Sequence, residues 1–216
     1  MEMIYRMIGI VAALAVLGSA PAMASSIVFS NTTTDTMDTV FYSAGPYSQL
    51  GDQIHLGGTD RLATAATVQF FNNGDTSTFD ATLRLYQVGS PVGAQIGPDF
   101  VVTNITAPSG LEFNVSFLAL NVTVPNDLIF TLSESNISGN ADIGVDMFEP
   151  PTIGTSSNQF LIAKQGSFSQ LATLPENVFF ELDATTATAA PEPGTLMALG
   201  CGLAVLLGAR KRRRRA

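Results

Sequence analysis

The chain has 216 residues, of which 46% are hydrophobic, a formal net charge of −8 and one cysteine. Its charges are unevenly placed: residues 25–190 contain three basic and sixteen acidic residues, a net charge of −13, whereas six of the ten basic residues stand together at positions 210–215. So acidic a body repels nucleic acid and anionic lipid, which argues against nucleic-acid binding, and a single cysteine excludes an internal disulfide framework.

Residues 1–24 have the three parts of a secretory signal peptide. Arg6 supplies the cation, residues 7–17 form the apolar segment, and Ala22-Met23-Ala24 is a small-residue cleavage site. The apolar segment is too short for a membrane helix and ends at Gly18, Ser19 and Pro21. We therefore predict export through the secretion machinery and cleavage by signal peptidase before Ser25.

Residues 25–183 show the period-two alternation of half-buried β-strands. The clearest case is the apolar series Phe79, Ala81, Leu83 and Leu85. Similar series occur at Ala66, Val68 and Phe70; at Val122 and Val124; at Leu128, Phe130 and Leu132; at Ile143, Val145 and Met147; and at Val178, Phe180 and Leu182.

Turn-forming clusters such as Asn72-Asn73-Gly74-Asp75 separate these series, at intervals that suit an antiparallel all-β domain. The pattern predicts an antiparallel β-sandwich of jelly-roll type with about ten strands, in which residues 66–71 and 79–88 pair as one hairpin. Residues 184–190, rich in Ala and Thr, are expected to be a linker.

Two short strings in this body resemble the β-sandwich ectodomains called choice-of-anchor domains. They are Gly51-Asp52-Gln53-Ile54 leading to Arg61-Leu62, and the strand Leu83-Arg84-Leu85-Tyr86. The resemblance implies a sandwich fold and no particular activity, because such domains share none.

The C-terminus is a tripartite tail at residues 191–216. Pro191 and Pro193 hold Glu192 on a stiff, extended segment, and the uncharged run that follows ends at Ala209. As a helix, its roughly fifteen residues reach about 22 Å of a hydrocarbon core about 30 Å thick, so we expect a short single transmembrane helix. Six consecutive basic residues then form a stop on the cytoplasmic side: Arg210, Lys211, Arg212, Arg213, Arg214 and Arg215.

This tail resembles the PEP-CTERM sorting signal of Gram-negative bacteria. Pro191, Glu192 and Pro193 fall on the three positions of the family motif, and the Arg-rich end is typical of it. The resemblance implies that an exosortase, a membrane-embedded cysteine peptidase, processes an inner-membrane precursor and passes the protein to the cell surface or extracellular matrix.

Candidate catalytic residues are scarce in the body. One functional interpretation pairs the single histidine, His55, with Asp52 and a distant serine as a hydrolase triad, but no Gly-x-Ser-x-Gly motif is present and an ordinary strand histidine is favoured. A glycosidase needs two carboxylates across a cleft. With sixteen acidic residues in the body, many such pairs are possible, so their presence alone does not indicate a glycosidase. The chain has no tryptophan, the usual platform for sugar stacking.

Calcium is the one ligand that the residue types favour. The candidates are the loop residues Asn72, Asn73 and Asp75, and the pair Asp142 and Asp146 on one strand face, all with the hard oxygens that calcium prefers. Solvated surface acids explain the same positions. We expect no other cofactor.

These observations predict a non-enzymatic exported protein of the cell surface or of an exopolysaccharide and biofilm matrix. The alternative functions are a secreted carbohydrate-binding module or a polysaccharide hydrolase. The expected partners are the exosortase, the export machinery and, for the body, an extracellular polysaccharide.

Overall fold

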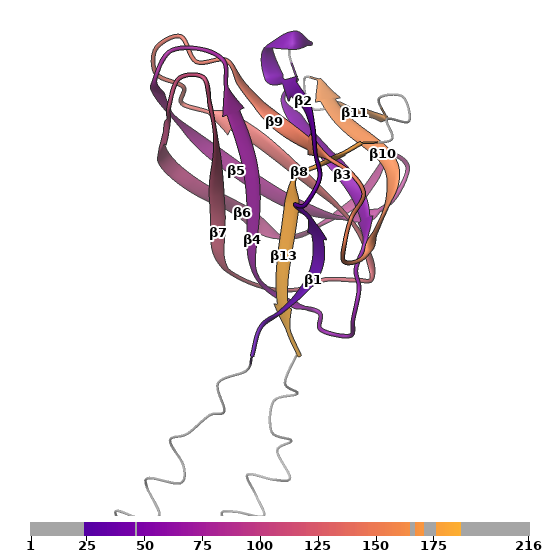
Figure 1. Cartoon of the computed structure of the whole chain (residues 1–216). Helices are drawn as coiled ribbons and strands as arrows, with labels where there is room; N and C mark the ends of the chain where they lie inside the picture. Colours follow the sequence, from indigo (N-terminus) through magenta and orange to yellow (C-terminus); the bar gives the residue numbers. More distant parts are fainter. Residues whose placement is uncertain (1–23, 46, 165–166, 171–175, 187–216) are drawn as a thin grey trace, which may run out of the picture. The chain divides into compact units, whose positions relative to one another are not determined.

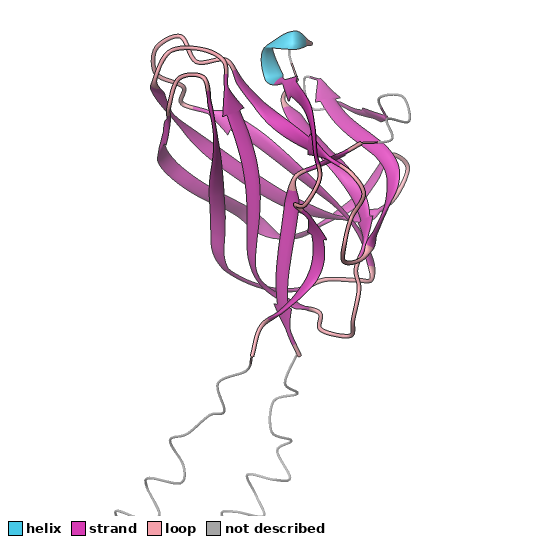
Figure 2. Ribbon diagram, in the orientation of Figure 1, coloured by secondary structure: helices cyan, strands magenta, loops and turns pink. Residues whose placement is uncertain are grey.

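The computed structural model describes residues 24–45, 47–164, 167–170 and 176–186. In these residues the chain forms two antiparallel β-sheets and one single-turn 3-10 helix, η1 (Tyr42–Ala44) (Figure 1, Figure 2). The seven-stranded sheet contains β1 (Ser26–Asn31), β2 (Asp35–Phe41), β4 (Leu62–Asn72), β7 (Leu111–Thr123), β9 (Ile143–Phe148), β12 (Asn177–Val178) and β13 (Phe180–Thr185). The six-stranded sheet contains β3 (Gln49–His55), β5 (Ser77–Val88), β6 (Val92–Ala107), β8 (Asp127–Ser135), β10 (Thr155–Lys164) and β11 (Ser167–Gln170).

The prediction of an all-β, two-sheet antiparallel sandwich is confirmed, and the jelly-roll type of its connections stays a prediction. In the seven-stranded sheet the order is β1-β13-β4-β9-β12, with β2 beside β9 and β7 beside β4. In the six-stranded sheet the order is β11-β10-β3-β8-β5-β6. The last strand in the described residues, β13, is therefore an interior strand, bonded to β1 on one side and to β4 on the other.

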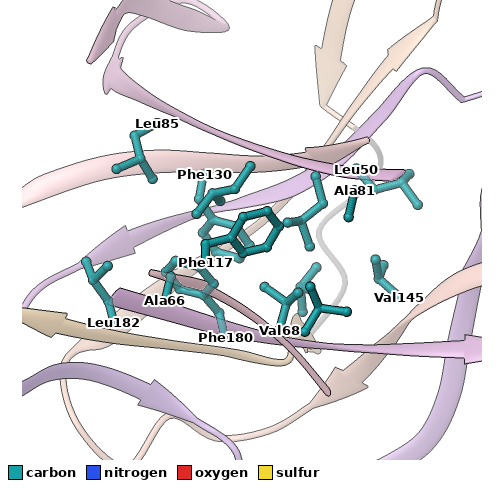
Figure 3. Close-up of a cluster of buried hydrophobic side chains, with 14 of the residues drawn as sticks. Leu50, Ala66, Val68, Ala81, Leu85, Phe117, Phe130, Val145, Phe180 and Leu182 are labelled. Atoms are coloured by element: carbon teal, nitrogen blue, oxygen red, sulfur yellow. The ribbon is translucent and has the colours of Figure 1, made fainter. Parts of the chain in front are cut away.

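Phenylalanines from both sheets fill the space between them. Phe130 of β8 and Phe180 of β13 stack with their ring centroids 3.9 Å apart and an interplanar angle of 8°, joining the two sheets (Figure 3). Burying one such side chain contributes roughly 1.5–3 kcal/mol. The predicted inner-facing residues of the sequence series at 66–70, 79–85 and 128–132 are all buried, so the period-two pattern assigned these faces correctly.

The predicted hairpin between residues 66–71 and 79–88 is wrong. β4 lies in the seven-stranded sheet, where β13 and β9 lie along one edge of it and β7 along the other, whereas β5 lies in the six-stranded sheet between β6 and β8. The physical reason is the turn at residues 73–76: the buried Asn72 side chain donates to the carbonyl oxygens of Asp75 at 2.8 Å and Ala107 at 3.1 Å. The chain thus crosses between the sheets at this point.

The sandwich has two distinct ends. At the stem end, β1 begins and β13 ends, and Leu62 of β4 pairs with Thr185. At the loop end, β4 finishes at Asn72, which pairs with Ile143, and the turn 73–76, the loop 136–142 and η1 come together. In Figure 1 the described chain enters and leaves at the same end, beside β1 and β13.

The boundary expected between the sandwich and its linker needs a small correction. Ala184 and Thr185 are buried and belong to β13, so the sandwich takes in the first two residues of the predicted linker. The predicted signal peptide, apart from Ala24, and the predicted transmembrane helix lie outside the described residues. In the part of the chain that is described, no helix has the length and apolar character needed to cross a membrane.

Candidate functional site

Asn72 organises the loop end. Besides its two donated hydrogen bonds, its Oδ1 accepts from the backbone N–H groups of Gly74 at 2.9 Å and Asp142 at 3.2 Å. A Cβ at Gly74 would lie 2.0 Å from the carbonyl oxygen of Asn140, so the turn 73–76 and the loop 136–142 touch through their backbones. The side chain of Asn72 is therefore fully used in fixing these two segments against each other.

Two carboxylates and a buried phenol come from segments at this end of the sandwich. Glu134 lies at the end of β8, where it pairs with the buried Ala81 of β5 and so shares the inner face of the sheet. Ser43 of η1 donates to Asp142 Oδ1 at 2.6 Å, which brings η1 against the loop 136–142. The neighbouring residue, Tyr42, is only 2% exposed.

The electrostatics of this set are unusual for a protein surface. Burial, and then the negative charge of Asp142, raise the pKa of Glu134 to about 7. Burial and the charge of Glu134 raise the pKa of Tyr42 well above its ordinary value. Glu134 Oε2 and Tyr42 Oη are both buried and accept or donate no hydrogen bond within the described residues. Near neutral pH Glu134 can therefore exchange a proton. Among the described residues no group of three His, Cys, Asp or Glu side chains could hold a metal ion.

The structure divides the predicted calcium ligands. Asp142 belongs to the set just described, and Asp75 lies next to it, its Oδ2 accepting from Asn140 Nδ2 at 3.5 Å. Asp146, four residues from Asp142, accepts a hydrogen bond from Thr39 at 2.8 Å, and its pKa is raised to about 6, chiefly by burial. Four residues of an extended strand span about 13 Å, too far for two carboxylates to share one ion. The structure thus does not support Asp142 and Asp146 as ligands of one calcium ion. The Asn72 side chain already forms four hydrogen bonds within the protein, so it is not a free calcium ligand.

A second polar site lies at the stem end around His55. The register places Asp127 of β8 and Thr155 of β10 directly opposite His55, and His55 Nδ1 lies 2.7 Å from Asp127 Oδ1. A groove of about 270 Å³ runs along these side chains. It is lined by Gln53, Ile54, His55, Asp127, Thr155, Ser156 and Ser157.

The structure does not pair His55 with Asp52, the triad interpretation that the sequence had already disfavoured. The two residues stand three apart in a strand, so their side chains point to opposite faces. Asp52 is fully buried between the sheets, where its Oδ2 accepts from the backbone N–H of Val178 at 3.1 Å and burial raises its pKa. In the groove, the hydroxyls of Ser156 and Ser157 both donate to the carbonyl oxygen of Gln53 at 3.3 Å.

Sequence reasoning missed Glu134, Tyr42 and Asp127. The burial of Glu134 could have been predicted from the sequence, because the inner-facing series Leu128, Phe130 and Leu132 continues to position 134 in steps of two. Asp127 needed the register between β3 and β8, and no pattern marks Tyr42. The sorting residues Pro191, Glu192 and Pro193 and the basic run 210–215 lie outside the described residues.

Comparison with known proteins bears on those last residues. The family model described as the PEP-CTERM protein-sorting motif matches residues 189–214. The chain is a PEP-CTERM domain-containing protein. It is accordingly an exported protein that an exosortase sorts to the cell surface or the extracellular space. The match leaves the activity of the sandwich open.

For the body of this PEP-CTERM protein, comparison supplies little more. No curated protein matches the chain. Two similar solved structures are those titled "Structure of infectious bursal disease virus Gx strain" and "Crystal structure of the T13 IBDV viral particle reveals a missing link in icosahedral viruses evolution". Each is 10% identical with a TM-score of 0.34; they cover 86% and 90% of this chain, and the chain spans 49% and 48% of theirs. Similarity at that level carries no argument about function.

Proposed function

We propose that the sandwich is a non-enzymatic structural protein of the cell surface or extracellular polysaccharide matrix of a Gram-negative bacterium. In this proposal the tail inserts as an inner-membrane precursor, and exosortase processing releases a finished domain. The observation that carries the proposal is the position of β13, the last described strand before the sorting motif.

β13 is bonded along both edges, with Ala184 opposite Ser26 of β1 and Thr185 opposite Leu62 of β4. The compact unit that contains the sandwich ends at Thr186, three residues before the matched motif begins. Cleavage near the motif therefore leaves every strand that the structure describes in place, with both edges of β13 still paired. The acidic surface, net −13 over residues 25–190, keeps such a released domain soluble at high local concentration.

The proposal predicts that Glu192→Ala blocks processing and leaves insertion unchanged. The apolar run and the basic stop that govern insertion are untouched, whereas the carboxylate held between the two prolines is lost. We expect uncleaved precursor to accumulate in the inner membrane of an exosortase-containing host, measured by fractionation and intact mass. Glu112→Ala, an exposed change on β7, is the control and should be processed normally. Wild-type mature protein that retains residues 196–216 would contradict the sorting route.

A glycan screen tests the non-enzymatic role. The mature protein is incubated with polysaccharides from the producing strain, and released reducing ends are measured over time. We expect no turnover. Turnover that disappears in Glu134→Gln or Asp142→Asn would establish a hydrolase at the loop end and overturn the proposal.

The groove at His55 favours glycan binding as a second candidate function. Its lining is rich in hydroxyl, amide, imidazole and carboxylate groups, which match the donors and acceptors of a sugar ring. At about 270 Å³ it is slightly smaller than the roughly 300–1,000 Å³ of most small-molecule pockets, a size suited to one end of a chain. Saturable binding that is lost in His55→Ala, without turnover, would support this function.

A further inference from the structure

The turn at residues 73–76 contains a chemically labile pair of residues. Asn73 is followed by Gly74, and no other asparagine of the chain precedes a glycine. Asparagine is a thermolabile residue, because the backbone nitrogen of the next residue can attack the carbon of its side-chain amide. Glycine favours this attack, since it has no side chain to obstruct the approach and adopts many backbone conformations. Asn73 is also exposed, so water reaches the site.

We propose that Asn73 is a site of spontaneous deamidation and that the Asn72 side chain controls its rate. In the first step the Gly74 nitrogen loses its proton and forms a bond to Asn73 Cγ, and the side-chain nitrogen takes up a proton and leaves as ammonia. Water then breaks one of the two bonds between the Gly74 nitrogen and a carbonyl carbon of the resulting ring. Breaking the bond to Cγ gives aspartate, whereas breaking the original peptide bond gives isoaspartate. The reaction needs water and no other reagent.

The structure holds the attacking nitrogen in a hydrogen bond. The Gly74 N–H donates to Oδ1 of the buried Asn72 at 2.9 Å. Loss of the Gly74 proton, which the attack requires, would leave this acceptor without its donor, and a buried polar atom without a partner is costly. The Asn73 N–H is fixed as well, since it donates to the carbonyl oxygen of Asp142 at 2.9 Å. The turn must therefore open before Gly74 can attack.

The turn is also packed closely against the loop 136–142. A Cβ added at Gly74 would lie 2.0 Å from the carbonyl oxygen of Asn140, and the Asp75 N–H donates to that same oxygen at 3.0 Å. Isoaspartate at position 73 would lengthen the backbone by one carbon atom between these fixed contacts. Either product would add a negative charge next to Asp75. We therefore expect deamidation to loosen the loop end.

Incubation of the exported full-length chain in a mildly alkaline buffer with mild detergent tests the proposal. Deamidation replaces NH2 by OH and raises the mass by roughly one unit, so peptide mass spectrometry locates and times it. We expect Asn73 of the native protein to react at least about tenfold more slowly than that of the urea-unfolded chain, because the hydrogen-bonded turn must open first. In rising urea the rate should follow the hydrogen exchange of the Gly74 amide. Equal rates in the native and unfolded chains, or deamidation that proceeds while this amide stays protected, would overturn the proposal.

Two substitutions separate the role of Asn72 from a general loosening of the loop end. Asn72→Ala removes the acceptor of the Gly74 N–H, so deamidation of Asn73 should become about tenfold faster in the folded protein. The matched control is Ser43→Ala, which removes the 2.6 Å hydrogen bond to Asp142 Oδ1 and leaves the bond between Asn72 and Gly74 in place. This control should react at the wild-type rate. An unchanged rate in Asn72→Ala, or an equal acceleration in Ser43→Ala, would show that Asn72 does not control the reaction.

Discussion

The two ends of the sandwich use polar side chains in opposite ways. At the stem end, Asp60 accepts hydrogen bonds from Ser26 at 2.6 Å and Thr186 at 2.7 Å, which lower its pKa, and the positive charge of the neighbouring Arg61 lowers it further. At the loop end, Glu134 is buried beside another acid and its pKa is raised. At the stem end, polar side chains thus form hydrogen bonds that hold the two ends of the described chain. At the loop end, the carboxyl group of Glu134 has no positively charged partner among the described residues.

The largest expected effect comes from removing the side chain that organises the loop end. Asn72→Ala leaves two backbone N–H groups and two carbonyl oxygens without their partner in a buried setting, so we expect a loss of about 3–5 kcal/mol in the free energy of unfolding. The matched change at the stem end is Asn126→Ala, where the exposed side chain accepts one hydrogen bond from Arg61. We expect that change to cost under about 1 kcal/mol. Urea denaturation measures both, and equal losses would remove the contrast between the ends.

An intermediate effect concerns pH. The folded pKa of Glu134 is raised to about 7 from 4.5, so the folded state binds more protons than the unfolded state between these values. Its contribution is therefore fully favourable below about pH 4.5 and is lost as pH rises toward 7. Because the group is only partly buried, we expect a loss of about 1–3 kcal/mol between pH 5 and 7.5 without calcium.

Glu134→Gln sharpens this comparison. The variant carries no titrating group at position 134, so its unfolding free energy should fall less over the same pH interval, measured by urea denaturation in a chelating buffer. Asp146, whose pKa is raised to about 6, leaves a residual fall at the lower part of the interval. A variant with the full wild-type pH dependence would show that Glu134 is not the group responsible.

The smallest effect is expected at the stem end. Asp60→Ala removes the acceptor that joins Ser26 to Thr186 but leaves the ladders of β1 and β13 intact. We expect faster hydrogen exchange in the first residues of β1 and the last of β13, with little change in global stability. Exchange measured by mass spectrometry should be unaltered in peptides from the loop end. Acceleration there would mean that the two ends are coupled.

The sequence predicted local features of the fold better than long-range ones. Alternation identified the inner faces of β4, β5 and β8 because the core imposes it residue by residue. The turn at residues 73–76 was recognised, but the sheet that receives the next strand depends on bonds from Asn72 to Ala107 and Asp142, far along the chain. The sequence pattern did not predict β6, because most residues of this strand are exposed and few apolar residues alternate along it.

The candidate site was predicted only in part for the same reason. Residue type pointed to Asp142, whereas Glu134 of β8 and Tyr42 of η1, which lie at the same end of the sandwich, come from separate segments of the chain. Similarly, His55 was noticed as the single histidine, whereas its carboxylate partner follows from the register of β3 with β8. The sorting motif was predictable in full, since it is a contiguous string that an enzyme reads without the fold.

The pairing of β1 with β13 also constrains when the protein can fold. Ser26 of β1 pairs with Ala184 of β13, so during export β1 can pair with β13 only after nearly all of the body has been exported. Contacts of such long sequence separation slow folding, since loop closure precedes the gain from pairing. An emerging chain would therefore remain unfolded and compatible with a narrow secretion channel until the stretch before the motif has passed.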